Sequence, residues 1–293
     1  MKYQVTHTTR YEYENLVSVA HHRLCLSPRS CAHQEIHSHS IQIDPFPDHI
    51  KSGTDYFGNP YTFLDLEMPH ATLELTARTC VSVAPITLPL PTATEPWEII
   101  RDLADGSHCS MADAASEFVF SSPFAERDID FQAYCAQSFP PELPILDGCE
   151  NLMHRIHADF AFDPTATTVA TPLKQVFKKR RGVCQDFAHL QIACLRSIGL
   201  PARYVSGYLE TQPPPGKPRL VGADASHAWV QAWCGPGFGW IDMDPTNNTF
   251  PSERHITLAW GRDFGDVSPS RGVLAGGGNH KLHVAVDVAP ILG

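Results

Sequence analysis

Nine cysteines are scattered through the chain, and one of them, Cys184, stands where a thiol could be reactive. It follows Arg181-Gly182-Val183, and the residues from 184 to 198 have the pattern of a largely buried helix. The free N–H groups and positive dipole end at a helix start favour a thiolate. A thiolate attacks carbonyl carbon, so the position predicts a nucleophile. The alternative is that Cys184 is one more small core residue, as most cysteines are.

A nucleophilic thiol needs a base, and two histidines compete for that role. His189 lies five residues along the predicted helix, which turns its side chain about 140° away from Cys184. We therefore interpret His189 as a core or surface residue. His227 is better placed, because it lies in the strand pattern SHAWVQAW, followed by a Gly-rich loop and the second strand WIDMD. Two such strands predict a β-hairpin.

Strand parity indicates which carboxylate could orient His227. If Trp233 pairs with Trp240, His227 shares one face of the hairpin with both Asp242 and Asp244. Asp244 is then the diagonal neighbour of His227, and Asp242 lies one pair further away. The spacing therefore favours Asp244. The alternative is an ordinary hairpin with a histidine at its edge and two aspartates near its turn.

Together Cys184, His227 and Asp244 have the residue types of a thiol acyl-transfer triad. The thiolate attacks an amide carbonyl, the histidine moves protons, and the aspartate fixes the imidazole tautomer and supports its cation. We expect the backbone N–H of Cys184 to face the oxyanion, with a second donor upstream in 160–177.

Three blocks carry a resemblance to a known family: RRGVCQDFAHLQIACLRSIGLPARYVSGY, ASHAWVQAW and GWIDMDPTNN. They resemble the transglutaminase-like superfamily of papain-type thiol enzymes. Its pattern has Cys after Gly-x, His before Ala-Trp and Asp before Pro-Thr, which match Cys184, His227 and Asp244. THTTRYEYE, FGNPYTFLDL and WGRDFGDVSPSRGVLAGGG resemble one bacterial branch, which includes candidate cysteine proteases. The resemblance implies a papain-like α+β core and no metal or organic cofactor. Some members of the family are catalytically dead, but all three triad positions are filled here. The resemblance also implies that Arg262, Asp263 and Asp266 of the carboxy-terminal signature border the site, and the alternative is a structural loop without a helix.

The expected reaction proceeds through a thioester acyl-enzyme. The sequence does not show whether water or an amine then takes the acyl group. Water would make the protein a peptidase or amidase, whereas an amine would make it a transglutaminase. We favour hydrolysis, because unrestrained crosslinking would harm a cytoplasm rich in protein glutamines and lysines. The other alternative is a non-catalytic or metal-binding interaction protein.

A metal site is the main rival from another chemical class. Its candidate ligands are His21, His22, Cys31, His33, His37 and His39. Zinc accepts such ligands, but no H-E-x-x-H and no C-x-x-C accompany them. His280 and His283 would lie on opposite faces of a strand. We therefore predict no metal.

The elements that must position the triad fall into two regions. Residues 1–85 alternate between apolar and polar with turn signals, which predicts an amino-terminal β-sandwich. A proline-rich linker over 85–96 separates it from a catalytic domain at 96–293. In that domain we expect strands at 202–210, 226–233 and 240–244. A final strand at 281–288 should set Leu282, Val284, Val286 and Val288 on one face.

Composition excludes several partners. The 293 residues include 22 Lys and Arg against 32 Asp and Glu, a net charge of −10. So acidic a chain is a poor ligand for nucleic acid or anionic membranes. No apolar run follows Lys2 and no stretch would span a membrane, so we expect a cytoplasmic protein. Its expected partner is a peptide or protein substrate. The basic run at 178–181 would be either a solvated loop or a selector of acidic substrates.

Overall fold

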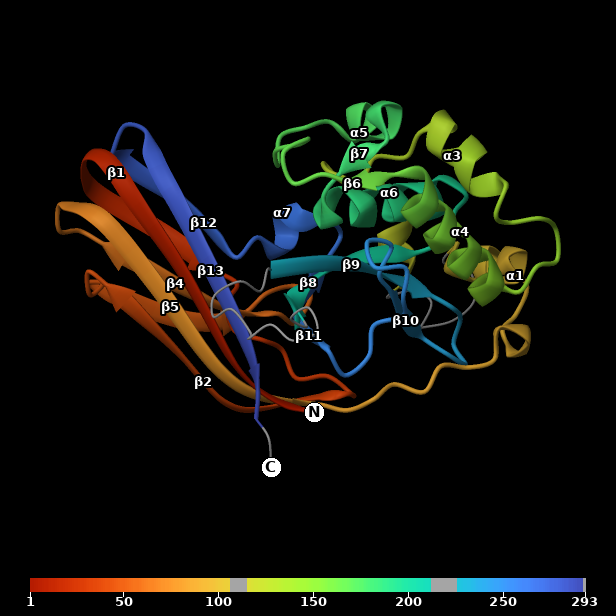
Figure 1. Cartoon of the computed structure of the whole chain (residues 1–293), viewed down its shortest axis with the longest axis horizontal. Coiled ribbons are helices and arrows are strands. Elements are labelled where there is room, and N and C mark those ends of the chain that lie inside the picture. The colour runs from red at the N-terminus through yellow and green to blue at the C-terminus, as the bar shows by residue number, and fades with distance from the viewer. Residues whose placement is uncertain (106–114, 212–225, 292–293) are drawn as a thin grey trace, which may run out of the picture.

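The computed structural model describes residues 1–105, 115–211 and 226–291. A large antiparallel sheet lies beside a mixed core of helices and strands (Figure 1). The sheet consists of β1 (Lys2–Leu24), β2 (Gln34–Asp44), β3 (His49–Thr54), β4 (Pro60–Leu66), β5 (His70–Val83), β12 (Ser270–Gly276) and β13 (His280–Pro290).

The long strand β1 belongs to both halves of this sheet. Its first half lies between β5 and β13, and its second half lies between β4 and β12. Apolar side chains from both halves, such as Leu24, Leu64 and Leu75, meet in one buried cluster. The halves therefore pack face to face, in agreement with the predicted amino-terminal β-sandwich.

The carboxy-terminal strand returns to this sheet, as a strand rather than as a separate domain. Only Val286 and Val288 of its predicted apolar face are buried, whereas Leu282 is 52% and Val284 51% exposed. The four side chains share one face of β13 as predicted, because its pairing with β1 has no register shift. Only the end of that face is covered, where Val286 and Val288 pack with Tyr208, Ile256 and Leu258. The division into domains 1–85 and 96–293 stays a prediction.

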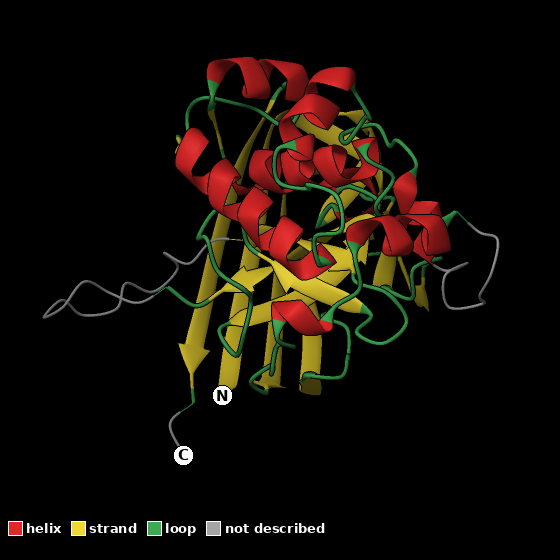
Figure 2. Ribbon diagram, turned by 90° about the vertical axis from the view of Figure 1, so that its right-hand side faces the viewer, coloured by secondary structure: helices red, strands yellow, loops and turns green. Residues whose placement is uncertain are grey.

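The second region combines helices with a sheet in the order β10-β9-β8-β11. Its strands are β8 (Ala202–Leu209), β9 (Ser226–Trp233), β10 (Trp240–Met243) and β11 (His255–Gly261), beside a short parallel pair, β6 (Ala161–Phe162) and β7 (Arg181–Gly182). The α-helices are α1 (Trp97–Ala104), α3 (Ile129–Ala136), α4 (Ile145–Asp159), α5 (Leu173–Lys179), α6 (Cys184–Ser197) and α7 (Phe264–Val267), and the 3₁₀-helices are η1 (Pro91–Ala93) and η2 (Glu117–Val119). Figure 2 shows most helices gathered above the strands.

Helix α6 is the centre of the apolar core of this second region. Its residues from Asp186 to Ser197 are all buried, and they share an apolar cluster with Ala228, Val230 and Ala232 of β9. The helix ends at Ser197, and Gly199 follows its cap with a φ of +85° that only glycine adopts readily. The predicted helix and the strands around it are therefore confirmed.

An apolar interface joins the two regions. Tyr3 and Val5 of β1 pack with Ile256 and Leu258 of β11. Polar contacts at this interface include Gln34 Nε2, which donates to Thr257 O at 2.7 Å. The sandwich therefore lies directly behind the strands that carry the site.

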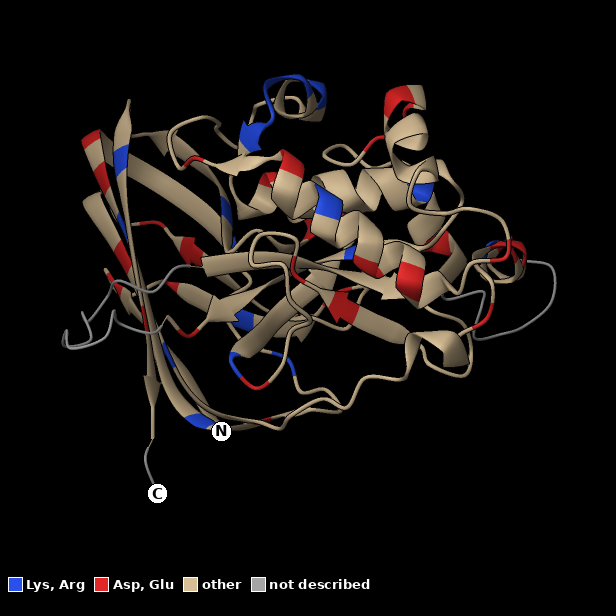
Figure 3. Ribbon diagram, turned by 45° about the vertical axis from the view of Figure 1, so that its right-hand side comes forward, with Lys and Arg blue, Asp and Glu red and all other residues tan. Residues whose placement is uncertain are grey.

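The basic run at 178–181 forms a positive cluster at the end of α5 (Figure 3). Lys178 and Lys179 are exposed, whereas the Arg180 guanidinium lies 4.4 Å from the centre of the Phe177 ring. None of the helices in the described ranges has the length and apolar character needed to cross a membrane.

Candidate active site

Cys184 is the first residue of α6, and the local sequence explains why the helix begins there. The preceding residue, Val183, is extended, and its N–H donates to Asp186 Oδ2 in the first turn at 2.9 Å. Thr167 Oγ1 donates to the same oxygen at 2.6 Å. A Cβ at Gly182 would lie 2.6 Å from that oxygen, so the Gly-x-Cys spacing leaves room for the capping carboxylate.

Cys184 differs in exposure from most other cysteines of the chain. It is half-buried, whereas Cys25, Cys135, Cys149, Cys194 and Cys234 are buried. Burial raises the pKa of Cys25 to about 11 and that of Cys234 to about 12. These thiols stay protonated at neutral pH and are poor nucleophiles. Cys109 lies outside the described residues.

His227, at the start of β9, connects Cys184 to Asp244. The Nε2 atom of its ring lies 2.7 Å from Asp244 Oδ2. The His227 side chain is also hydrogen-bonded to the Cys184 side chain. Since Nε2 faces the carboxylate, Nδ1 is the ring nitrogen left for the thiol. Burial alone would lower the pKa of His227, but the hydrogen bonds to Asp244 and Cys184 outweigh it and raise the pKa to about 10. The ring is therefore an imidazolium at neutral pH, which suits an ion pair with a thiolate.

Asp244 is completely buried and held from both sides. Its Oδ1 accepts the backbone N–H groups of Thr246 and Asn247 at 3.0 and 3.1 Å. Its Oδ2 accepts from Asn247 Nδ2 at 2.7 Å and from His255 Nε2 at 3.1 Å, in addition to His227. Burial would raise the pKa of this carboxyl, but the hydrogen bonds from the two histidines hold it well below its usual range. Asp244 is therefore a permanent anion beside His227.

The hairpin has the predicted register, with Trp240 opposite Trp233 and Asp242 opposite Gln231. Asp242 does not touch His227. It accepts from Trp229 Nε1 at 2.6 Å and from Gln231 Nε2 at 2.9 Å. The structure thus sets Asp244 on the histidine and leaves Asp242 to anchor a tryptophan.

His189 lies in the core, away from the base position. Its ring stacks on Phe124 at 5.6 Å and packs against Tyr204 at 4.9 Å. Its Nε2 accepts the backbone N–H of Phe264 at 3.2 Å, and burial lowers its pKa to about 3. The His189 ring is therefore neutral and fixed in place, so we assign it a packing role and not that of the base.

The group Arg262, Asp263 and Asp266 forms structural contacts. Arg262 makes a two-pronged ion pair with Asp266, with both N···O distances at 2.9 Å. Asp263 caps α7 and accepts the N–H of Phe124 at 3.0 Å. These contacts favour the structural-loop interpretation.

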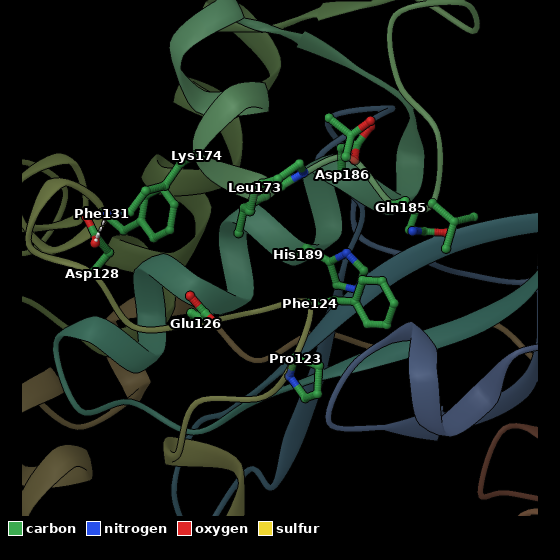
Figure 4. A pocket seen from close by; sticks show the side chains of 14 residues that line it. Pro123, Phe124, Glu126, Asp128, Phe131, Leu173, Lys174, Gln185, Asp186 and His189 are labelled. Atoms are coloured by element: carbon green, nitrogen blue, oxygen red, sulfur yellow. Dashed lines mark ion pairs between the residues drawn. The ribbon is translucent and has the colours of Figure 1, made fainter.

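A cavity of about 290 Å³ adjoins the start of α6 (Figure 4). Gln185, which directly follows the thiol, lines it together with Leu173 of α5 and Phe124. An ion pair between Lys174 and Asp128 lies on its wall. Cys184 is not among the lining residues, so the cavity begins one residue along the helix from the thiol.

Three side chains of the site lie close enough together to hold a metal ion. The ligand atoms of His227, Asp244 and His255 lie within 4.8 Å of one another. Their hydrogen bonds at 2.7 and 3.1 Å account for this closeness without an ion. In the parts of the chain that the structure describes, the amino-terminal histidines form no such group: His37, for example, bonds to Ser82, and His39 lies between Ser27 and Thr79.

Sequence reasoning missed two residues of this site, Asn247 and His255. Asn247 stands in the quoted block GWIDMDPTNN, but no spacing rule shows that its side chain folds back to Asp244. His255 reaches the site because β11 pairs with β8, a long-range register that local pattern does not report.

Comparison with known proteins places these features in a family. The bacterial transglutaminase-like N-terminal region matches residues 3–82, and the transglutaminase-like superfamily matches residues 135–245. An uncharacterized protein of Mycobacterium tuberculosis is 40% identical over 100% of this chain and 94% of its own length. A protein-glutamine gamma-glutamyltransferase of Pseudomonas aeruginosa is 37% identical over 98 residues, which are 32% of this chain and 14% of that protein.

A solved structure shares the fold over the whole chain. It is a candidate cysteine protease of Cytophaga hutchinsonii, with a TM-score of 0.75, 19% identity, and coverage of 100% of this chain and 92% of that chain. These relationships support a thiol-dependent enzyme. The chain belongs to the transglutaminase-like superfamily, and its α+β fold joins an amino-terminal β region to a papain-like transglutaminase core.

Proposed function

We propose that Cys184, His227 and Asp244 are the catalytic triad of an enzyme that transfers acyl groups from amide or peptide bonds. One observation carries the proposal: a single imidazole is hydrogen-bonded to a thiol at a helix start and to a completely buried carboxylate. The raised pKa of His227 keeps a proton ready for a leaving amine.

The triad supports a reaction in two halves. The Cys184 thiolate attacks the amide carbonyl carbon, and the oxyanion faces the backbone N–H of Cys184, which has no partner within the helix. His227 Nδ1–H then protonates the amide nitrogen, so that the C–N bond breaks and an amine leaves. A thioester remains on the sulfur, and His227 is neutral. In the second half His227 takes a proton from the attacking water or amine, the thioester C–S bond breaks, and the ion pair forms again.

We propose water as the usual acceptor, which makes the protein a peptidase or amidase. Free transfer to amines would crosslink proteins in the cytoplasm, where we predict the enzyme acts on a peptide or protein. The second candidate is a transglutaminase that joins a glutamine acyl group to an amine. The similarity to the Pseudomonas glutamyltransferase over 98 residues favours that candidate.

One experiment separates these outcomes. The protein and its Cys184→Ala variant are incubated with a peptide library, with and without a labelled primary amine, and products are weighed by mass spectrometry. We expect cleaved or deamidated peptides from the native protein alone. Amine-adducted glutamine as the dominant product would replace hydrolysis by transamidation. No product from any amide, with an unreactive Cys184, would overturn the enzyme proposal.

A further inference from the structure

A second histidine contacts the carboxylate of Asp244. His255, the first residue of β11, places Nε2 at 3.1 Å from Asp244 Oδ2, the oxygen that lies 2.7 Å from His227 Nε2. The two imidazole rings are 6.0 Å apart at an angle of 49°. One carboxylate oxygen is therefore shared by two histidines from different strands.

The hydrogen bonding of His255 fixes where its proton lies. The ring is buried, and its Nδ1 has no hydrogen-bond partner among the described residues. A carboxylate only accepts, so Nε2 must carry the proton that reaches Asp244. His255 is thus a fixed donor toward Asp244.

Packing prevents His255 from turning away. The Trp229 ring meets it edge-on at 5.3 Å and also lies 6.1 Å from the His227 ring. Asp242 anchors the Trp229 indole at 2.6 Å. The backbone N–H of His255 donates to Ser252 O at 3.0 Å. Both imidazoles are therefore held against one immobile tryptophan.

The charged and titratable groups around this carboxylate come from four elements. His227 lies on β9, Cys184 on α6 and His255 on β11. Asp242 on β10 is turned toward Trp229 and Gln231 instead. Near the start of β11, Arg254 pairs with Glu210, and neither makes a hydrogen bond to Asp244 within the described part of the chain.

We propose that His255 is a positioning residue of the triad, whose N–H keeps Asp244 Oδ2 aimed at His227. The proposal rests on the catalytic role of the triad. Without this donor Oδ2 keeps only two side-chain partners, and the carboxylate can rotate away from His227. The bond between Asp244 and the imidazolium weakens, and the thiolate–imidazolium pair becomes less stable. A donor that merely competed for Oδ2 would have the opposite effect, because its loss would free charge for His227.

The test follows alkylation of Cys184 by iodoacetamide against pH in the full chain, with each cysteine quantified by peptide mass spectrometry. The rate has a step at high pH where His227 loses its proton. His255→Leu should slow alkylation at pH 7 by about tenfold, the expected cost of a charge-assisted hydrogen bond, and should move the high-pH step to lower pH. His255→Gln keeps a side-chain N–H and should recover most of the rate.

His7→Leu is the matched control. His7 is also a buried histidine, but it bonds to Tyr208 and Thr9 instead of Asp244, so its loss should leave the profile unchanged. Thermal unfolding shows whether each variant folds. Should His255→Leu not fold, His255→Asn, whose shorter amide draws back from Asp244, takes its place and should show the same loss.

Three results would overturn the positioning role: a native profile in the variant without the donor, a profile no different from that of His7→Leu, or a step moved to higher pH. Failure of the triad itself would look different. In that case native Cys184 would react no faster than Cys31 and Cys80, two half-buried cysteines of the sandwich.

Discussion

Replacing Asp244 with asparagine tests the central feature of the site, a buried anion that raises the pKa of His227. Both carboxylate oxygens accept only: Oδ1 from two backbone N–H groups and Oδ2 from three side chains. An amide offers a single oxygen. In either orientation its NH₂ group therefore faces donors, and the charge that supports the imidazolium is gone.

The expected size of the effect follows from the bond that is lost. A hydrogen bond to a charged group contributes about 1.5–3 kcal/mol, and 1.4 kcal/mol corresponds to about one pKa unit. In Asp244→Asn the pKa of His227 should therefore fall from about 10 by roughly one to two units. Catalytic turnover should fall by at least about tenfold and should not vanish, because nucleophile and base remain.

The assay is the same alkylation profile of Cys184, with Asp242→Asn as the matched control. Asp242 is buried two residues earlier, in β10, and bonds to Trp229 and Gln231. An asparagine there keeps an oxygen that can accept the indole N–H of Trp229, so the high-pH step should stay in place. The pH dependence of the free energy of unfolding tests independently whether folding raises the pKa of His227. A histidine pKa raised by folding stabilises the protein fully below about pH 6.5, and this contribution is lost as the pH rises toward 10. In Asp244→Asn the loss of stability with rising pH should be smaller. A high-pH step of the alkylation profile that moves in Asp242→Asn and not in Asp244→Asn would refute the reasoning.

Three further predictions concern the surroundings of the site. Cys184→Ala should abolish activity and change the free energy of unfolding by less than about 1 kcal/mol. Cys194 is buried, so Cys194→Ala should lower the free energy of unfolding by about 1 kcal/mol or more and leave alkylation of Cys184 intact. Equal effects of the two variants on activity would contradict this. Burial lowers the pKa of His7 to about 4, so the free energy of unfolding should fall by up to about 1.4 kcal/mol per pH unit through this group as the pH falls from 6.5. In urea titrations the stability of His7→Leu should depend less steeply on pH than that of the native protein. Parallel pH dependences would contradict this. A Cβ at Gly207 would lie 2.3 Å from Ile256 O and 2.4 Å from the Trp229 ring, so Gly207→Ala should destabilise by about 2 kcal/mol or more, while Gly237→Ala, with nothing within 4 Å, should be neutral in thermal unfolding.

The parts of the site that could be predicted are those that local geometry controls. A helix start places Cys184, and alternation along one hairpin decides between Asp242 and Asp244, because side chains of paired strands share a face. Both arguments span few residues and need no knowledge of the tertiary structure.

The parts that could not be predicted depend on how distant segments meet. Leu282 and Val284 have the same pattern as Val286 and Val288, yet only the second pair is covered, because the catalytic region reaches only the end of β13. His255 likewise depends on the pairing of β11 with β8, which includes a register shift between Thr257 and Ala259. Alternation cannot be extrapolated through such a shift.

The same strand, β11, also gives the amino-terminal sandwich a definite part in the architecture of the site. Its residue Ile256 is buried against Tyr3 and Val5 of the sandwich, while the adjacent His255 bonds to Asp244. Successive residues of a strand point to opposite faces, so packing that fixes Ile256 also fixes the direction of His255. The sandwich therefore backs β11 from the side opposite the carboxylate. If His255 positions Asp244, the sandwich stabilises the triad through this strand without touching the thiol, and a weakened interface should alter Cys184 reactivity before it alters the core.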